Sequence, residues 1–330
     1  MPAEEPAQAG IPASKLWGVA DAAAWLRPPA DNDHKYTRGV LAARIGSARY
    51  PGAAVLGVSA AWRTGIGMVR YVAPLDDAQP ELGLPTPAAA VLAARPETVF
   101  GDGSCDAWLV GSGTDSGSCS VAETAAIAHL HTGETPIVLD AGALDSALAR
   151  TEASAPAVLT PHIGEIRRLW AEADLGPLPL LRPQGAGSGT VPLSAVARLA
   201  TRLSATILLK GSITTVVSPG GRVMSVGPAT PWLATAGTGD VLAGILGALV
   251  ARHAGPVRAN PEVLAPLAAT AALVHDVAAR LASGDDATDP TQCAGTPITA
   301  LDVACAVPKA ISTLSRLAPC TTSPGSTKRS

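Results

Sequence analysis

The stretch that most constrains the fold of this chain is Ala234-Thr235-Ala236-Gly237-Thr238-Gly239-Asp240-Val241-Leu242. Two glycines flank a threonine, an aspartate follows, and apolar residues then recur at helical spacing. A glycine-rich loop that opens a helix exposes N–H groups at the positive end of the helix dipole, which suits a phosphate or a developing oxyanion. Asp240 would add an acceptor at that spot, but an aspartate behind a glycine turn is also an ordinary helix N-cap. The stretch alone leaves both interpretations open.

The chain upstream of this stretch predicts a parallel sheet. Residues 39–45 and 68–73 have the pattern of strands, and a helix is expected from Pro51 to Arg63 between them. A strand–helix–strand unit of this kind implies a right-handed crossover between parallel strands. Gly46 and Gly52 do not give the spacing of a dinucleotide-binding loop, so we reject a Rossmann site.

Four further strands are predicted to end in residues that suit a functional site. The strands are expected at 107–110, 136–140, 157–162 and 206–209. They end, in that order, at Gly111 and Gly113, at Asp140, at Thr160 and His162, and at Lys210. Since ligands of open α/β sheets lie beyond the carboxyl ends of the strands, we expect these groups to converge on one edge.

The remaining elements are expected around this sheet. Helices are predicted at 15–29, 118–131, 194–204, 262–282 and 298–317, the last kinked at Pro308, with a hairpin at 214–217 and 222–226 and loops at 176–192 and 253–261. The sequence therefore predicts a single α/β domain over residues 15–318, with disordered segments at 1–14 and 319–330.

Composition excludes several classes of function. Of the 330 residues 47% are hydrophobic, and the net charge is -3, with no basic run longer than a pair, so nucleic acid is not an expected partner. The five cysteines form no CxxC pair, which is typical of a reducing cytosol. No run of about 18 uninterrupted apolar residues occurs, so no membrane-spanning helix is expected.

The groups at the strand ends favour phosphoryl chemistry. They comprise a phosphate-friendly loop, a lysine, carboxylates and a histidine, without a Ser–His–Asp order or a metal cluster. Phosphoryl transfer needs positioning and electrostatic stabilisation, with a carboxylate to accept the proton of a hydroxyl.

Several stretches also resemble one known family. Gly237-Thr238-Gly239-Asp240 at the start of a helix resembles the signature of the ribokinase-like superfamily. Other stretches resemble one branch of it, the bacterial ADP-dependent NAD(P)H-hydrate dehydratases, which repair hydrated nicotinamide cofactors. They include His34-Lys35, Tyr50-Pro51-Gly52-Ala53-Ala54, Leu159-Thr160-Pro161-His162, and Leu209-Lys210-Gly211 with Thr214. The resemblance covers residues 34–250 and implies a ribokinase-like three-layer α/β/α sandwich around a mainly parallel sheet.

The resemblance implies a role for each matching position. Ala53, Gly113 and His162 fall where the family contacts hydrated NAD(P)H. Positions of the nucleotide site, for ADP or AMP, are Lys210, Gly211, Ser212, Ile213, Thr214 and Gly239. Asp240 falls where the family places the residue that faces the substrate hydroxyl, which makes it the expected catalytic base. The turn of Gly237, Thr238 and Gly239 would form an anion hole.

The implied reaction is the ADP-dependent dehydration of the S epimer of NADHX or NADPHX to NAD(P)H, with AMP and phosphate as products. It also implies Mg²⁺, without identifying its ligands, a cytoplasmic homotetramer, and a separate NAD(P)H-hydrate epimerase as functional partner. No epimerase-like stretch is recognised before Lys15.

The chain departs from the family pattern at a few positions. Tyr36 stands where many relatives have glycine, and Ile163 stands where proline is usual. Gly227–Thr230 lacks the asparagine and Thr-Gly often found before the signature, and the 176–192 segment has no assigned counterpart.

Two other functions are compatible with parts of the sequence. A superfamily kinase of a vitamin precursor or sugar would share the Gly-x-Gly-Asp loop and would stop at a stable phosphorylated product. A nucleotide-binding module without catalysis would bind but not turn over. The motifs at Ala53 and His162 disfavour the first, and the presence of Lys210 with Asp240 disfavours the second.

Overall fold

The computed structural model of this chain describes residues 14–75, 83–115, 117, 119–180, 191–285 and 295–316. The predicted disordered segment at 319–330, the one at 1–14 except its last residue, and positions 181–190 of the 176–192 segment lie outside the described residues.

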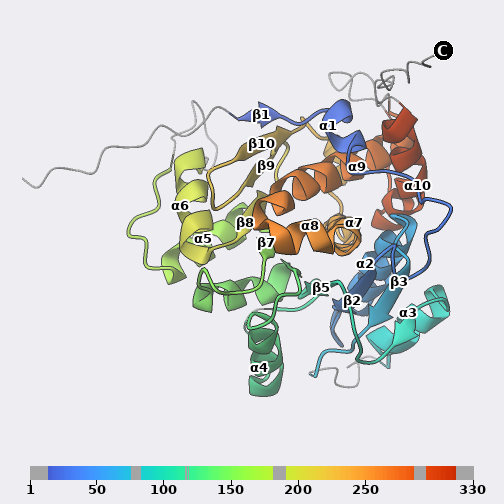
Figure 1. Cartoon of the computed structure of the whole chain (residues 1–330), viewed down its shortest axis with the longest axis horizontal. Helices are drawn as coiled ribbons and strands as arrows, with labels where there is room; N and C mark the ends of the chain where they lie inside the picture. Colours follow the sequence, from blue (N-terminus) through green and yellow to red (C-terminus); the bar gives the residue numbers. More distant parts are fainter. Residues whose placement is uncertain are drawn as a thin grey trace, which may run out of the picture.

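A ten-stranded, mostly parallel sheet forms the centre of the molecule (Figure 1). The strand order is β1-β10-β9-β8-β7-β6-β5-β2-β3-β4, and only the pairs β8–β9 and β9–β10 are antiparallel. The strands are β1 Lys15–Leu16, β2 Val40–Arg44, β3 Met68–Tyr71, β4 Val99–Phe100, β5 Ala107–Val110, β6 Ile137–Leu139, β7 Ala157–Leu159, β8 Thr206–Leu209, β9 Thr214–Val217 and β10 Val223–Val226.

Helices cover both faces of the sheet, so the three-layer α/β/α prediction is confirmed. One face carries α1 Val19–Ala23, α2 Pro51–Arg63, α3 Pro87–Ala94, α7 Thr238–Arg252, α8 Ala254–Ala259, α9 Leu264–Ser283 and α10 Ala300–Arg316. The opposite face carries α4 Val121–Leu130, the 3₁₀ segment η1 Ala141–Ala149, α5 Ile163–Glu172 and α6 Leu193–Leu203. Two short 3₁₀ turns, η2 Pro231–Leu233 and η3 Pro261–Val263, complete the description.

The central strands are apolar on both sides because each face is covered. In β6, Val138 belongs to the core under α7 and α9, whereas Ile137 and Leu139 belong to the core under η1 and α5. Successive side chains of a strand point to opposite faces, so one short strand contributes to both cores. This is why the sequence shows continuous apolar runs rather than alternation.

A close helix crossing fixes the position of the α7 N-terminus. A Cβ built on Gly244 of α7 would lie 2.2 Å from the carbonyl oxygen of Gly57 in α2. Glycine at this contact lets the two backbones approach. α2 itself begins at Pro51, a favoured first helical residue.

Two sequence-based predictions of local structure were wrong, and two elements were missed. The segment 15–29 is not one helix, because Lys15 and Leu16 pair in parallel with Met224 and Ser225 of β10 and leave only a five-residue helix. The segment 253–261 contains α8, since Val257 is fully buried in the core. The helix α3 and the segment η1 were not predicted.

The long apolar helix near the C-terminus is a core helix in this fold. The segment 261–283 is long and apolar enough to cross a membrane, but 83% of its most apolar window is buried inside the protein. The predicted helix 298–317 is present as α10 with Pro308 in its interior.

Candidate functional site

The strand ends converge as predicted. β5, β6, β7 and β8 are consecutive parallel neighbours in the sheet, so the residues that follow them share one edge. His162 and Lys210 even form an isolated parallel bridge beyond the ends of their strands.

Asp140 is the buried anchor of this edge. Its Oδ2 accepts a hydrogen bond from Ser112 Oγ at 2.8 Å. Its Oδ1 accepts from Thr160 Oγ1 at 2.7 Å and from Lys210 Nζ at 3.1 Å. A buried carboxylate needs such partners, and here three of them come from three neighbouring strand ends. Asp140 therefore holds the lysine in place.

Lys210 carries a stabilised positive charge. Glu165 Oε2, in the first turn of α5, lies 3.9 Å from Lys210 Nζ. Burial opposes the charged form of Lys210, but the charges of Asp140, Glu165 and Asp240 outweigh it and raise the pKa of the lysine. The ammonium group is thus a fixed cation next to the start of α7, where a Cβ on Gly239 would lie 3.8 Å from Nζ.

The N-terminus of α7 is open. Its N-cap is Gly237, with φ +88° and no side-chain cap, and Asp240 lies in the first turn. The interpretation of Asp240 as the N-cap was therefore wrong. A Cβ on Gly237 would lie 2.6 Å from Leu56 Cδ1, so both the left-handed backbone and the space require glycine. Thr238 N already donates to Thr235 O at 3.3 Å, whereas the next N–H groups of the first turn have no partner within the helix and suit an anion.

Among the carboxylates at this site, Asp240 has the most strongly shifted pKa. Burial and the nearby charge of Asp140 raise its pKa to about 7, against the opposing effect of Lys210. A carboxylate with a pKa near neutrality can accept a proton and release it again at physiological pH. Asp240 is thus equipped to act as a general base.

A cavity of about 500 Å³ adjoins these groups, which we call the strand-end cavity. Of the predicted nucleotide and anion-hole residues, Lys210, Gly211, Ser212, Thr214, Thr238 and Gly239 line it. Ile213 does not line it, and its side chain is exposed. Thr230 of the loop before η2 and His275 of α9 also line it; the sequence had marked Thr230 only as part of a segment that departs from the family pattern, and had not marked His275.

The residues predicted to contact the hydrate form a second group on the same edge. A Cβ built on Gly113, whose φ is +70°, would lie 2.3 Å from Ala53 Cβ and 3.3 Å from Gly46 Cα. The loop after β5 therefore packs directly on the start of α2, and glycine is required there. Ala53 and Gly113 are brought together, as the prediction needed.

His162 has a local structural role in addition to its place at the edge. Its Nδ1 accepts hydrogen bonds from Gly164 N at 2.9 Å and Glu165 N at 3.3 Å, while Glu165 Oε2 accepts from His162 N at 2.7 Å. This reciprocal capping box starts α5 and leaves the imidazole side chain 58% exposed. Nε2 lies 3.6 Å from Glu165 Oε2.

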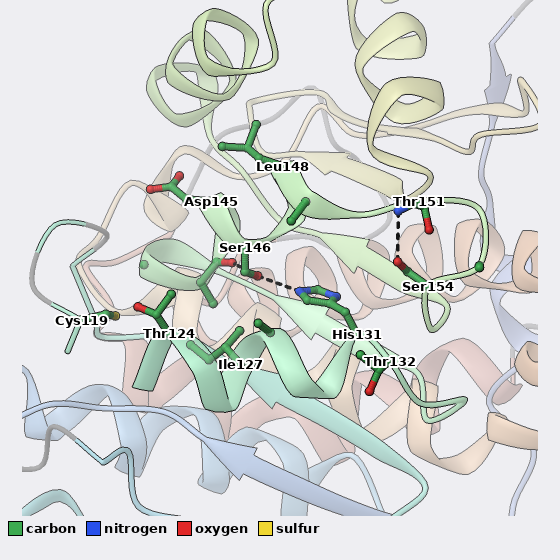
Figure 2. A pocket seen from close by; sticks show the side chains of 15 residues that line it. Cys119, Thr124, Ile127, His131, Thr132, Asp145, Ser146, Leu148, Thr151 and Ser154 are labelled. Carbon is green, nitrogen blue, oxygen red and sulfur yellow. Dashed lines mark hydrogen bonds between the residues drawn. The ribbon is translucent and has the colours of Figure 1, made fainter. Parts of the chain in front are cut away.

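A larger cavity lies apart from this site, between α4, η1 and the 151–154 turn (Figure 2). This α4–η1 cavity has a volume of about 580 Å³ and a mainly apolar wall that includes Ile127 and Leu148. Its histidine, His131, contacts Ser146 Oγ through Nε2 at 3.0 Å, one of the dashed contacts in Figure 2. The strand-end residues do not line it.

The side chains at the strand ends limit the kind of metal site that can form there. Within residues that the structure describes, no group of three or more His, Cys, Asp or Glu side chains is suited to bind a metal ion. Both oxygens of Asp140 already accept hydrogen bonds, which leaves Asp240 as the freer carboxylate. Mg²⁺ commonly uses one or two carboxylates, several waters and the phosphates of a substrate. The residues fit that kind of site, and they do not fit an ion held by the protein alone. Of the cysteines, Cys105 and Cys305 form no disulfide within the described part of the chain, and Cys293 and Cys320 lie outside it.

Comparison with known proteins connects this geometry to a family. The family model of NAD(P)H-hydrate dehydratases matches residues 43–299. The chain is 38% identical over 242 residues to the bifunctional NAD(P)H-hydrate repair enzyme of Mycobacterium tuberculosis, covering 71% of this chain and 45% of that protein. It is 35% identical over 236 residues to the ADP-dependent (S)-NAD(P)H-hydrate dehydratase of Neisseria meningitidis serogroup B, covering 68% of this chain and 73% of that protein. The chain thus spans under half the length of the bifunctional relatives.

Solved structures share the fold. The ADP/ATP-dependent NAD(P)H-hydrate dehydratase of Bacillus subtilis, co-crystallised with ATP and Mg²⁺, aligns with a TM-score of 0.68 at 22% identity, covering 91% of this chain and 99% of that one. A ribokinase-like superfamily protein of Enterococcus faecalis aligns with a TM-score of 0.67 at 18% identity, covering 92% and 97%.

Proposed function

This chain belongs to the NAD(P)H-hydrate dehydratase family, and we propose that it converts the S epimer of hydrated NADH or NADPH back to NAD(P)H in an ADP-dependent reaction. The observation that carries the proposal is that Asp240, in the first turn of α7, lies within the electrostatic influence of Lys210, which Asp140 holds in an ion pair. Burial and Asp140 raise the pKa of this aspartate to about 7, and the lysine charge is fixed beside it.

The first step is phosphoryl transfer. The hydrate carries a hydroxyl at C6 of its nicotinamide ring, and Asp240 accepts the proton of this hydroxyl. The oxygen then attacks the terminal phosphorus of ADP, the bond to the bridging oxygen breaks, and AMP leaves. Charge that develops on the transferred group is stabilised by Lys210 and by the N–H groups of the Gly237–Asp240 turn.

The second step is elimination. Phosphate is a far better leaving group than hydroxide, so the lone pair of the ring nitrogen expels it from C6. Loss of the proton from the neighbouring C5 restores the dihydronicotinamide ring. The sum is hydrate plus ADP going to NAD(P)H, AMP and phosphate. No covalent bond to the protein forms. The residues of this chain position the two reactants, stabilise the charge on the transferred group and accept one proton.

The two reactants are assigned to adjoining parts of the edge. We assign the hydrate to Ala53, Gly113 and His162, supported by the packing of Gly113 on Ala53. ADP is assigned to Lys210–Thr214 and Gly239, of which all but Ile213 line the strand-end cavity or adjoin Lys210 directly. Mg²⁺ would supply Lewis-acid stabilisation of the phosphates and would be held mainly by them and by water.

The wider setting is also a proposal. We propose one catalytic domain over residues 15–318, a homotetramer, and a cytoplasmic location. An NAD(P)H-hydrate epimerase would supply the S epimer from the R epimer and is the expected functional partner. Small nucleotides are the expected ligands, and neither nucleic acid nor membrane is an expected partner.

The direct test is recovery of absorbance at 340 nm from NADHX, with ADP and ATP compared and with AMP and phosphate quantified. We expect stoichiometric formation of NADH, AMP and phosphate with ADP. A stable phosphorylated product without NADH would instead establish a kinase of the same superfamily. Calorimetric binding of ADP without any turnover of NADHX would establish a non-catalytic binding module. NADPHX assayed in parallel measures the preference between the two hydrates.

A further inference from the structure

An exposed arginine lies beside the part of the sheet edge that we assign to the hydrate. Arg49 directly precedes Tyr50, the residue before α2, and 75% of the Arg49 side chain is exposed. A Cβ built on Gly113 would lie 3.3 Å from the carbonyl oxygen of Tyr50 and 2.3 Å from Ala53 Cβ. The backbone next to Arg49 therefore contacts the same glycine loop that packs on Ala53.

The guanidinium of Arg49 bridges the two loops that form this contact. Its Nη1 donates to Asp115 Oδ2 at 3.2 Å, and Asp115 lies in the loop after β5 that also carries Gly113. The guanidinium also lies over the ring of Tyr50, 5.3 Å from the ring centroid. The aromatic ring and the carboxylate thus hold the charge of Arg49 at the surface beside Gly113.

The contact with Asp115 leaves Arg49 able to bind a further anion. An arginine has five N–H donors in a planar fork, and within the described part of the chain Arg49 makes one hydrogen bond, the one to Asp115. The two side chains are 75% and 47% exposed, and water screens exposed ion pairs, so this pair contributes little to stability. A ligand of higher negative charge can therefore displace the carboxylate at small cost.

Other cations near this edge already have assigned partners. Arg44, at the end of β2, is buried and donates to both carboxylate oxygens of Glu123. Lys210 is paired with Asp140, on the side that we assign to ADP. In the two loops that meet at Gly113, residues 45–50 and 111–120, Arg49 is the only Lys, Arg or His.

The proposed substrates carry phosphates that must lie some distance from the reacting ring. NADHX and NADPHX both contain a diphosphate between their two nucleosides, and NADPHX carries a further 2′-phosphate. A Cβ built on Gly57 of α2 would lie 3.6 Å from the carbonyl oxygen of Asp240. At the helical rise of about 1.5 Å per residue, about 9 Å of α2 separates this contact from Pro51, where the helix begins. One nucleoside fits in this separation, so the phosphate attached to it falls beside the start of α2.

We propose that Arg49 binds a phosphate of the hydrate and so helps to select a dinucleotide substrate. The proposal rests on the function proposed above and deepens it. When the hydrate binds, the guanidinium exchanges Asp115 for phosphate oxygens, which match its planar fork, while the ring of Tyr50 keeps it in place. The carboxylate of Asp115 then opposes binding, because it repels the phosphate.

The test uses the full-length protein at saturating ADP and measures kcat and KM for NADHX and for NADPHX separately. Arg49→Ala removes the guanidinium, Arg49→Lys keeps the charge without the fork, and Asp115→Asn removes the competing carboxylate. Arg222→Ala is the matched control, because Arg222 is 54% exposed in an ion pair with Glu262. Arg222 lies in the turn between the antiparallel strands β9 and β10, at the opposite edge of the sheet. Titration with NADPH, followed by its fluorescence, measures binding without turnover.

We expect Arg49→Ala to raise the KM for the hydrate about tenfold, as the loss of one charge-assisted hydrogen bond would. The kcat and the KM for ADP should change little. Arg49→Lys should lose less affinity, Asp115→Asn should lower the KM for the hydrate, and Arg222→Ala should behave as wild type. Thermal melting of each variant checks that it is folded.

Salt dependence and the choice of hydrate give two further measurements. The KM of the wild type for the hydrate should rise with salt concentration, and this rise should be smaller in Arg49→Ala, a difference that a merely structural role would not produce. An equal effect of Arg49→Ala on both hydrates identifies the diphosphate as the bound group. An effect on NADPHX alone identifies the 2′-phosphate.

The phosphate proposal and the dehydratase function can fail separately. Wild-type KM values of Arg49→Ala for both hydrates would show that Arg49 binds no phosphate of the substrate, and the turnover itself would support the dehydratase function. A raised KM for ADP alone would also overturn the proposal, since Arg49 would then contact the nucleotide. Absence of NADHX turnover in the wild type would reject the dehydratase function, whereas NADPH binding that weakens in Arg49→Ala would still support the phosphate contact.

Discussion

Two buried histidines in two cavities show what marks a ligand site in this molecule. Burial lowers the pKa of His131 in the α4–η1 cavity to about 4, with a contribution from Arg150, and burial lowers the pKa of His275 in the strand-end cavity to the same value. His131 uses both ring nitrogens, with Arg150 at 2.9 Å from Nδ1 and Ser146 at 3.0 Å from Nε2. His275 leaves Nε2 without a partner.

The difference lies in hydrogen-bond satisfaction. Arg150 also donates to the backbone carbonyls of Ala155, Leu203 and Ser204, so His131 is part of a closed network that ties η1 to α6. The α4–η1 cavity is larger, but its histidine has no unused bonding capacity. In both cavities the lowered pKa of the histidine reports its burial. The unused hydrogen-bonding capacity of His275 Nε2 is what distinguishes the strand-end cavity.

The two cavities are expected to differ most at Asp240, a carboxylate that has no counterpart beside His131. We expect Asp240→Asn to lower the turnover of NADHX by about 10²–10⁴-fold, the usual contribution of a general base. Calorimetric binding of ADP should persist, because the lysine and the helix N-terminus remain. Near-normal turnover in this variant would show that Asp240 is not the base.

The pH profile is the next largest effect. Because the base must be ionised, kcat/KM should fall about tenfold for each pH unit below the Asp240 pKa of about 7 and level off above it. Initial rates between pH 5 and 9, under conditions where the protein stays folded, measure this pH dependence. A flat profile between pH 5.5 and about 7 would contradict the assigned acidity.

The same raised pKa has a consequence for stability with a definite sign. The folded pKa of Asp240 lies above its ordinary value of 3.8, so ionisation disfavours the folded state. Its stabilising contribution is complete below the unfolded pKa and is lost as the pH rises towards 7. Asp240→Asn should therefore melt at a higher temperature than wild type at pH 8, and the gap should narrow towards pH 4.

A change at His131 tests the other cavity. His131→Leu leaves the bonds of Arg150 and Ser146 to the ring unmade, so we expect a loss of about 1–3 kcal/mol in the free energy of unfolding. Urea denaturation measures this loss. The KM for ADP and the kcat of the folded variant should equal those of wild type. A weakened KM for ADP would show that the α4–η1 cavity is coupled to nucleotide binding.

The smallest effect is expected at the rim of the α4–η1 cavity. Asp145 accepts two hydrogen bonds from Arg168, but both side chains are partly exposed. Such pairs contribute about 0–1 kcal/mol, so Asp145→Asn should change the urea midpoint only slightly. A loss as large as that of His131→Leu would show that the rim, and not only the buried network, stabilises this region.

The sequence by itself determined the elements whose signals are local. The helix at Pro51–Arg63 and the strands Ala107–Val110, Thr206–Leu209 and Thr214–Val217 lie where the pattern predicted them. Continuous apolar runs indicated a sheet covered on both faces. The Gly237–Asp240 loop indicated a helix start and left open whether Asp240 caps it or faces an anion site. These signals depend on residue period and on glycine or proline at one position, so neighbours in sequence are sufficient.

Only the tertiary structure decided which distant groups meet. The sequence predicted that Asp140 and Lys210 lie at one edge of the sheet. It did not predict that Ser112 and Thr160 bond to Asp140, which follows from the strand order β5-β6-β7-β8. Lys15–Leu16 became a strand through pairing with β10, against its local helical pattern. Thr230 and His275 carry no motif, and they line one cavity because a buried aspartate and arginine hold the loop before η2 to α9. Hydrogen-bond satisfaction is a property of the packed chain, so the unpartnered Nε2 of His275 cannot be identified from spacing alone.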